Sequence, residues 1–243
     1  MYSIYVARND CPNSLASLDR ALGGKPADEK QLAWRLNCAV RAKDPKRVEI
    51  AEELVRRFPK KDYFGYLASQ YAEQKLDARA MLNVWRFGFE RNLLSSEDQY
   101  LAYAQTAVDA GFAIEAQRAL ESGIKAGTVK KGDATSRSGR LLASSTGIAA
   151  EERKRLPQAD KEARAGRNGE ADFAVGASFY GLGDYPKAVE ALGRALQADR
   201  AARIRRPDDA NMLHGISLLE LKKRAEAEKA FAARLRDLDR DVG

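Results

Sequence analysis

Three short breaks in the sequence share one design, and they constrain the fold more than any other feature. The breaks are Asn9-Asp10-Cys11-Pro12, Lys43-Asp44-Pro45 and Gly183-Asp184-Tyr185-Pro186. In each, small or polar residues suited to a turn precede a proline that stands early in the following helix. A proline is tolerated there because the first amide groups of a helix have no intrahelical acceptor. The breaks therefore predict helix–turn–helix units that recur along the chain.

The segments around these breaks follow the helical period. Apolar residues recur at spacings of three and four, which is typical of one buried helix face. No sustained period-two alternation and no Asn-Gly or Asp-Gly hairpin between β-branched runs occurs, so strands are not expected. The pattern predicts an all-α chain. The clearest stripes are Val48, Ala51, Leu54, Val55 and Phe58; Ala188, Val189, Leu192, Ala195 and Leu196; and Ala227, Ala230, Phe231 and Leu235.

The segment from Ala171 to Leu196 resembles the tetratricopeptide repeat, a helix–turn–helix unit of about 34 residues. Gly176 stands at the small residue of the family's first helix and Ala188 at that of its second, where small side chains let the two helices approach closely. Phe179 stands at the aromatic position and Gly183-Asp184-Tyr185 at the turn. The family's usual proline after the second helix is missing, because Arg200 stands there.

The same template fits at other places along the chain. The corresponding small residues Ala68, Ala104, Gly176 and Gly215 lie 36, 72 and 39 residues apart. The middle interval is two periods, so a degenerate unit is expected between the second and third of these residues, with Gly147 at its turn. The resemblance implies a right-handed superhelix of about seven helix pairs.

We expect this array to form one continuous solenoid in three parts. Residues 1–131 would hold the N-terminal helix pairs, residues 132–168 a degenerate, charged helix pair or linker, and residues 169–243 the two C-terminal units. The first helix starts at residue 1, as if inside a repeat, so we expect the chain to be a fragment of a longer protein with an upstream signal peptide.

The order of several features is also similar to that of bacterial tetratricopeptide proteins that carry signal peptides and reside in the periplasm. The matching segments are 56–63, the charged linker, the Ala171 unit and 206–210. The resemblance implies a periplasmic location, with the cytoplasm as the alternative. It implies no defined biochemical activity.

Composition argues against catalysis and against a metal site. The chain has one histidine, His214, and two cysteines, too few for a His-rich or thiolate metal cage. No phosphate-binding glycine loop or nucleophile elbow occurs. No nucleophile or orienting group is evident for the histidine, so a packed or solvated helix residue is expected there. We expect no enzyme activity, no cofactor, no small-molecule substrate and, without a long apolar run, no membrane span.

The charge is basic but interspersed. The chain carries 42 Lys+Arg against 35 Asp+Glu, a net charge of +7. Most of these side chains alternate in sign along helix faces, as on ordinary solvated helices. The densest basic stretch contains Arg200, Arg203, Arg205 and Arg206, which we interpret as a connector between helices. No regular basic column of a nucleic-acid-binding repeat is evident, so a nucleic-acid partner is not expected.

The cysteines are candidates for a disulfide. Cys11 lies at the start of the second helix of the first pair, and Cys38 lies near the end of the next helix. In a tetratricopeptide stack these helices pack side by side, which implies that the two residues come within disulfide range. Two buried free thiols in a cytosolic protein are the alternative. A bridge would favour an oxidising compartment.

The resemblance also implies a concave groove lined by the first helix of each pair. Its candidate partner-binding residues are Phe173, Ala177, Tyr180, Met212, Ile216 and Leu219, a set unusually apolar for positions outside the core. An exposed apolar patch of this kind would bind a partner. Alternatively, these side chains pack between repeats or lie under the C-terminal segment.

The function that these features predict is a non-catalytic scaffold that binds a peptide or helix of a partner protein in the concave groove. Two alternatives remain. One is a basic solenoid that binds nucleic acid or another anionic polymer, and the other is an accessory module of a larger enzyme whose catalytic part lies upstream.

Overall fold

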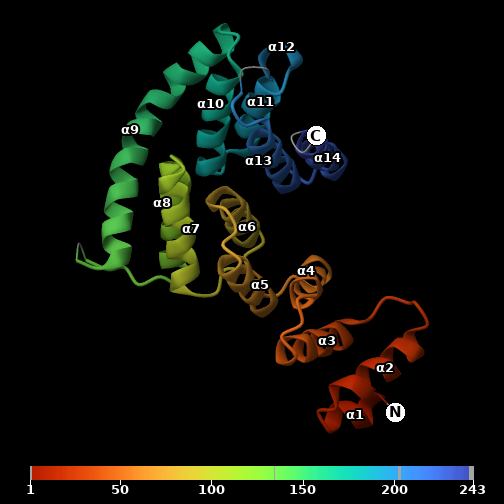
Figure 1. The fold of residues 1–243 in the computed structure, drawn as a ribbon. Helices are drawn as coiled ribbons and strands as arrows, with labels where there is room; N and C mark the ends of the chain where they lie inside the picture. The colour runs from red at the N-terminus through yellow and green to blue at the C-terminus, as the bar shows by residue number, and fades with distance from the viewer. Residues whose placement is uncertain (1, 134, 202–203, 241–243) are drawn as a thin grey trace. The chain divides into compact units, whose positions relative to one another are not determined.

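The prediction of an all-α chain is confirmed. The computed structural model describes residues 2–133, 135–201 and 204–240, and within these ranges it contains helices joined by turns and no strand. Each helix packs mainly against its neighbours in the sequence, which is compatible with a helical repeat (Figure 1).

The chain divides into two compact units. The first is formed by Met1–Leu76 and Arg91–Ser95, and the second by Asp77–Glu90 and Ser96–Gly243. The division between Leu76 and Asp77 lies inside the segment 1–131, which we expected to form one continuous part of the solenoid.

The first unit consists of five helices, in which α1 packs on α2, and α4 packs on both α3 and α5. Local signals set several of the helix starts. Asp10 caps α2 by accepting a hydrogen bond from the amide of Asn13, with Pro12 in the first turn. Asp28 and Gln31 form a reciprocal capping box at α3. The helices are α1 (Tyr2–Ala7), α2 (Cys11–Leu22), α3 (Glu29–Arg41), α4 (Arg47–Arg57) and α5 (Lys61–Glu73).

The second unit contains the segment that most resembles a repeat. Asp184 caps α11, and Gly183, with a φ of 75°, ends α10 in the left-handed conformation that a glycine adopts without strain. The helices are α6 (Ala78–Glu90), α7 (Glu97–Asp109), α8 (Ala113–Lys125), α9 (Arg137–Ala165), α10 (Gly169–Leu182), α11 (Tyr185–Ala195), α12 (Ala198–Ala201), α13 (Pro207–Glu220) and α14 (Arg224–Arg240).

The close approach expected between the helices of the Ala171 unit is present. Ala188 of α11 is fully buried. A Cβ atom added to Gly176 of α10 would lie 2.6 Å from Cγ of Leu192 on α11, so only a glycine fits at this position without movement. The small residues therefore set the spacing of α10 and α11.

The segment 132–168 differs from expectation, because it folds as one long helix rather than a helix pair. Gly147 lies inside α9 instead of at a turn. The buried residues of this helix explain why: Leu141, Ser145, Ala149 and Leu156 follow one another at spacings of four and seven and so form one continuous face. An interior glycine costs about 1 kcal/mol in a helix, which packing along such a face can offset.

Helix α9 packs against three other helices of the second unit, namely α7, α8 and α10 (Figure 1). Pro157 lies inside the helix, where it removes one backbone hydrogen bond. The ribbon curves along its length, concave toward α8 and α10 (Figure 1).

Candidate functional site

The structure places three of the six groove candidates inside the protein. Ala177, Tyr180 and Ile216 are 4%, 0% and 8% exposed and belong to the main core of the second unit. Their burial agrees with the alternative in which these side chains pack between repeats. The reason is that α10, which carries Ala177 and Tyr180, packs against α8, α9, α11 and α13, and that α13, which carries Ile216, packs against α10, α11 and α14. These three residues are therefore not part of a binding surface.

The other three groove candidates lie nearer the surface but do not form one site. Phe173 and Met212 are partly buried against the same core, and Leu219 is 38% exposed. Of the six, Phe173 lines a pocket.

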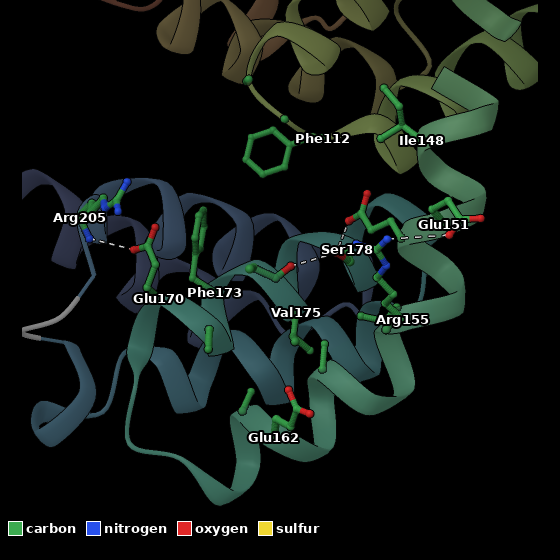
Figure 2. Close-up of a pocket in the computed structure, with 18 of the residues that line it drawn as sticks. Phe112, Ile148, Glu151, Arg155, Glu162, Glu170, Phe173, Val175, Ser178 and Arg205 are labelled. Carbon is green, nitrogen blue, oxygen red and sulfur yellow. Dashed lines mark hydrogen bonds and ion pairs between the residues drawn. The ribbon is translucent and has the colours of Figure 1, made fainter. Parts of the chain in front are cut away.

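The pocket has a volume of about 990 Å³ and opens between the turn before α8, the middle and C-terminal part of α9, and the first part of α10 (Figure 2). Its floor is apolar and its rim is charged. Ile148 at its edge is 52% exposed, the largest exposure after Ile4 among the large hydrophobic residues with described side chains. Residues that α9 contributes are Gly147, Ile148, Glu151, Glu152, Arg155, Leu156, Ala159, Glu162 and Ala163.

The α9 wall is a regular stripe of one helix face. Ile148, Glu151, Arg155, Ala159 and Glu162 follow one another at spacings of three and four, so they point the same way over about four turns. The stripe combines apolar side chains with charged ones, so it presents an amphipathic surface to whatever enters the pocket.

An aromatic pair forms the end of the pocket near α8. Phe112, in the turn before α8, meets Phe173 of α10 edge to face, with ring centroids 6.5 Å apart and an interplanar angle of 87° (Figure 2). This is a favourable geometry for two aromatic rings. The guanidinium of Arg86 lies 4.8 Å from the centroid of the Phe112 ring, a cation–π contact. The position of Phe112 is thus fixed by its neighbours on α6 and α10.

Arg86 is itself held rigidly. Its Nε and Nη2 atoms donate hydrogen bonds of 2.8 Å each to the two carboxylate oxygens of Glu115, and the hydroxyl of Tyr103 donates to the same carboxylate at 2.7 Å. Burial alone would lower the pKa of Arg86, but the charge and hydrogen bonds of Glu115 outweigh it and raise that pKa. The guanidinium therefore stays charged beneath the aromatic wall.

The polar rim carries charges of both signs, and some of its groups are already engaged. Ser178 donates a hydrogen bond to the carboxylate of Glu152, and the backbone amide of Arg205 donates to Glu170 at 3.0 Å (Figure 2). Glu151 and Arg155 form an exposed ion pair at 4.0 Å, a distance at which little free energy is gained.

Of the arginines of the basic stretch that the structure describes, one is used in packing and two line the pocket. Arg200 donates to Asp172 at 2.6 Å and to the carbonyl of Ala163 at 3.2 Å, so its charge is used to join α12 to α9 and α10. Arg205 and Arg206 line the pocket, and Arg203 lies outside the described residues. The connector expected from the sequence thus has a specific role in packing.

Within the described ranges, no group of three or more His, Cys, Asp or Glu residues could hold a metal ion. His214 of α13 is half-buried, and burial lowers its pKa below the usual 6.5; nearby Glu226 raises the pKa and Lys223 lowers it. No described helix is long and apolar enough to cross a bilayer.

The two cysteines lie together. Cys11 of α2 and Cys38 of α3 form a disulfide, with Cα atoms 5.6 Å apart. The bridge lies in the first unit, whereas the pocket lies in the second.

Comparison with protein-family models finds no match for this chain, and none of the curated proteins matches it significantly. The site must therefore be judged by its geometry.

Sequence reasoning missed most of the pocket. Phe112 and the α9 stripe were not singled out, because the template assigns the groove to the first helix of each pair and a long unpaired helix has no place in it. No apolar period marks the stripe, because Glu151, Arg155 and Glu162 are charged, as on the solvated face of an ordinary helix.

Proposed function

We propose that this chain is a non-catalytic scaffold of the tetratricopeptide type and that it binds a segment of a partner protein in the pocket between α9 and α10. The repeat-like close packing of Gly176 against Leu192 and the sequential pairing of helices support the family assignment. A right-handed superhelix and a periplasmic location belong to the same proposal.

The observation that carries the proposal is the combination of an apolar floor, a preordered aromatic pair and a rim of mixed charge. Ile148 and the Phe112–Phe173 pair offer apolar surface for one or two side chains of a partner. Because Phe112 is fixed by Arg86 before any ligand enters, little freedom is lost on binding.

The occupant that fits is a peptide segment with aliphatic or aromatic side chains flanked by charged residues of both signs. The stripe on α9 extends over about four turns, or about 20 Å, which matches a short helix or an extended segment better than a small metabolite. The rim would contribute orientation, since exposed ion pairs contribute little affinity.

The test starts from peptides selected for binding to the full chain from a random dodecapeptide library. Their affinities are then measured by fluorescence anisotropy for two variants, Ile148→Asp in the pocket and Leu182→Asp on α10 outside it. Both side chains are substantially exposed, 52% and 39%, so both variants should fold.

We expect Ile148→Asp to weaken binding about tenfold or more, as loss of one buried aliphatic contact would, and Leu182→Asp to leave it unchanged. Failure to select any peptide, or equal affinities for the two variants, would show that the pocket is not a peptide site.

A further inference from the structure

The N-terminal hairpin formed by α1 and α2 has few non-covalent contacts with the helix that follows. Of the 12 residues of α2, the structure buries Ser14 and Leu18. Trp34 of α3 donates a hydrogen bond of 2.8 Å from its indole nitrogen to Ser14, and Arg35 forms an exposed ion pair with Asp19. Arg41 donates a long hydrogen bond of 3.5 Å to the carbonyl of Asn9. A hairpin of this size buries too little apolar surface to be stable alone.

The disulfide supplies the stability of attachment that these non-covalent contacts do not provide. It joins the first turn of α2 to the last turns of α3 and closes a loop with a sequence separation of 27. Closing a loop of this length favours the attached state about a hundredfold or more in the chain-entropy model. Attachment of the hairpin therefore depends on the oxidation state of one pair of sulfur atoms.

The surroundings of the two sulfur atoms are unequal. Cys38 is 3% exposed, whereas Cys11 is only partly buried, so an incoming thiolate can reach the sulfur of Cys11. The Nη1 atom of Arg41 lies 3.8 Å from the sulfur of Cys11. A guanidinium at this position stabilises a thiolate on Cys11, and it attracts an anionic thiol reagent.

We propose that the Cys11–Cys38 disulfide is a reducible clasp, through which a dithiol reductant releases the α1–α2 hairpin from α3 and a small-molecule disulfide, itself reduced to two thiols by exchange with Cys11 and Cys38, reattaches it. In reduction, a thiolate of the dithiol attacks Cys11, the Cys11–Cys38 bond breaks, and Cys38 leaves as a thiolate that takes up a proton. The second thiol of the reductant then loses its proton, and the resulting thiolate attacks the reductant sulfur that is bonded to Cys11. This step frees Cys11 as a thiolate beside Arg41 and leaves the reductant as a cyclic disulfide. The inference is independent of the proposed peptide site.

The experiment measures amide hydrogen exchange of the full chain with and without dithiothreitol, at the pH where the oxidised protein is stable. Reduction should speed exchange in α2 about a hundredfold, while α10 and α11 in the second unit exchange at their original rates. A Cys11→Ser, Cys38→Ser double variant should reproduce the reduced pattern without any reagent.

Three results would overturn the proposal. The first is two titratable thiols in the oxidised protein, and the second is equal exchange of α2 in both states. The third is faster exchange throughout the chain on reduction, which would mean that the disulfide stabilises the whole fold. The role of Arg41 is tested separately with Arg41→Gln, for which we expect reoxidation by oxidised glutathione at neutral pH to slow at least threefold. Unchanged reoxidation would remove Arg41 from the proposal.

Discussion

Arg86 and Glu115 form a bidentate ion pair inside the second unit, with 1% and 2% of their side chains exposed. The pair joins α6 to α8, and the guanidinium also packs on the ring of Phe112. Removing two charges from water is costly, and the cost is recovered only while both partners and their hydrogen bonds are in place. The integrity of this pair therefore governs both the stability of the unit and the aromatic wall of the pocket.

Replacing Arg86 by methionine should destabilise the chain by about 3–5 kcal/mol, because Glu115 would be left buried without its positive partner. Urea unfolding followed by circular dichroism measures the change. The double variant Arg86→Met, Glu115→Gln should recover part of the loss, since no uncompensated charge remains. An additive double variant would mean that the two residues do not stabilise each other.

The buried carboxylate of Asp172 allows a second test of how burial strengthens an ion pair. It is completely buried and accepts hydrogen bonds from Arg194 at 2.9 Å and from Arg200 at 2.6 Å. Asp172→Ala should cost about 3 kcal/mol, because two largely buried guanidinium groups each lose one of their acceptors. The matched variant Glu151→Gln breaks the exposed pair with Arg155 and should cost less than about 0.5 kcal/mol. Similar losses for the two variants would contradict the burial of Asp172.

Two glycines in helices should respond oppositely to alanine. In Gly176→Ala the added Cβ would lie 2.6 Å from Leu192, so we expect a loss of about 1–3 kcal/mol from overpacking. In Gly147→Ala the Cβ would meet nothing within 4 Å, so the better helix propensity of alanine should stabilise the chain by about 0.5–1 kcal/mol. Thermal unfolding of the two variants distinguishes these signs. A stabilising Gly176→Ala would show that α10 and α11 can move apart freely.

Stability should fall in mild acid because of His214. Burial lowers the pKa of this residue in the folded chain, so the unfolded chain binds the proton more readily. The contribution is therefore fully present above the unfolded pKa near 6.5 and is lost as the pH falls through and below that value. Unfolding free energies of the wild type and of His214→Gln, compared between pH 7.5 and 5.5, should diverge, with the wild type losing more. Parallel curves would show that the half-buried histidine titrates normally.

The sequence predicts those parts of the fold that depend on neighbouring residues. Asp184 caps α11 and Gly176 admits Leu192, as the repeat template requires, because turn chemistry and side-chain size act locally. The sequence does not predict α9 as one helix. Gly147 lowers helix stability only a little, and the packing of one long buried face contributes more free energy than this glycine costs. The apolar groove expected from the sequence is also misplaced. The repeat template leaves Tyr180 exposed, but in the structure this residue is buried because α10 has helices packed on several sides.

The length of α9 has a consequence for how the second unit unfolds. In an array of short hairpins, each repeat can open while its neighbours stay folded, because a repeat contacts only the next one. Here one uninterrupted helix packs against α7 and α8 and also against α10. Fraying of either end removes the partner of the helices beside it, so these elements should lose and regain their structure together. A single sharp transition, rather than a sequence of partial ones, is the behaviour that such a shared helix imposes on α7 to α10.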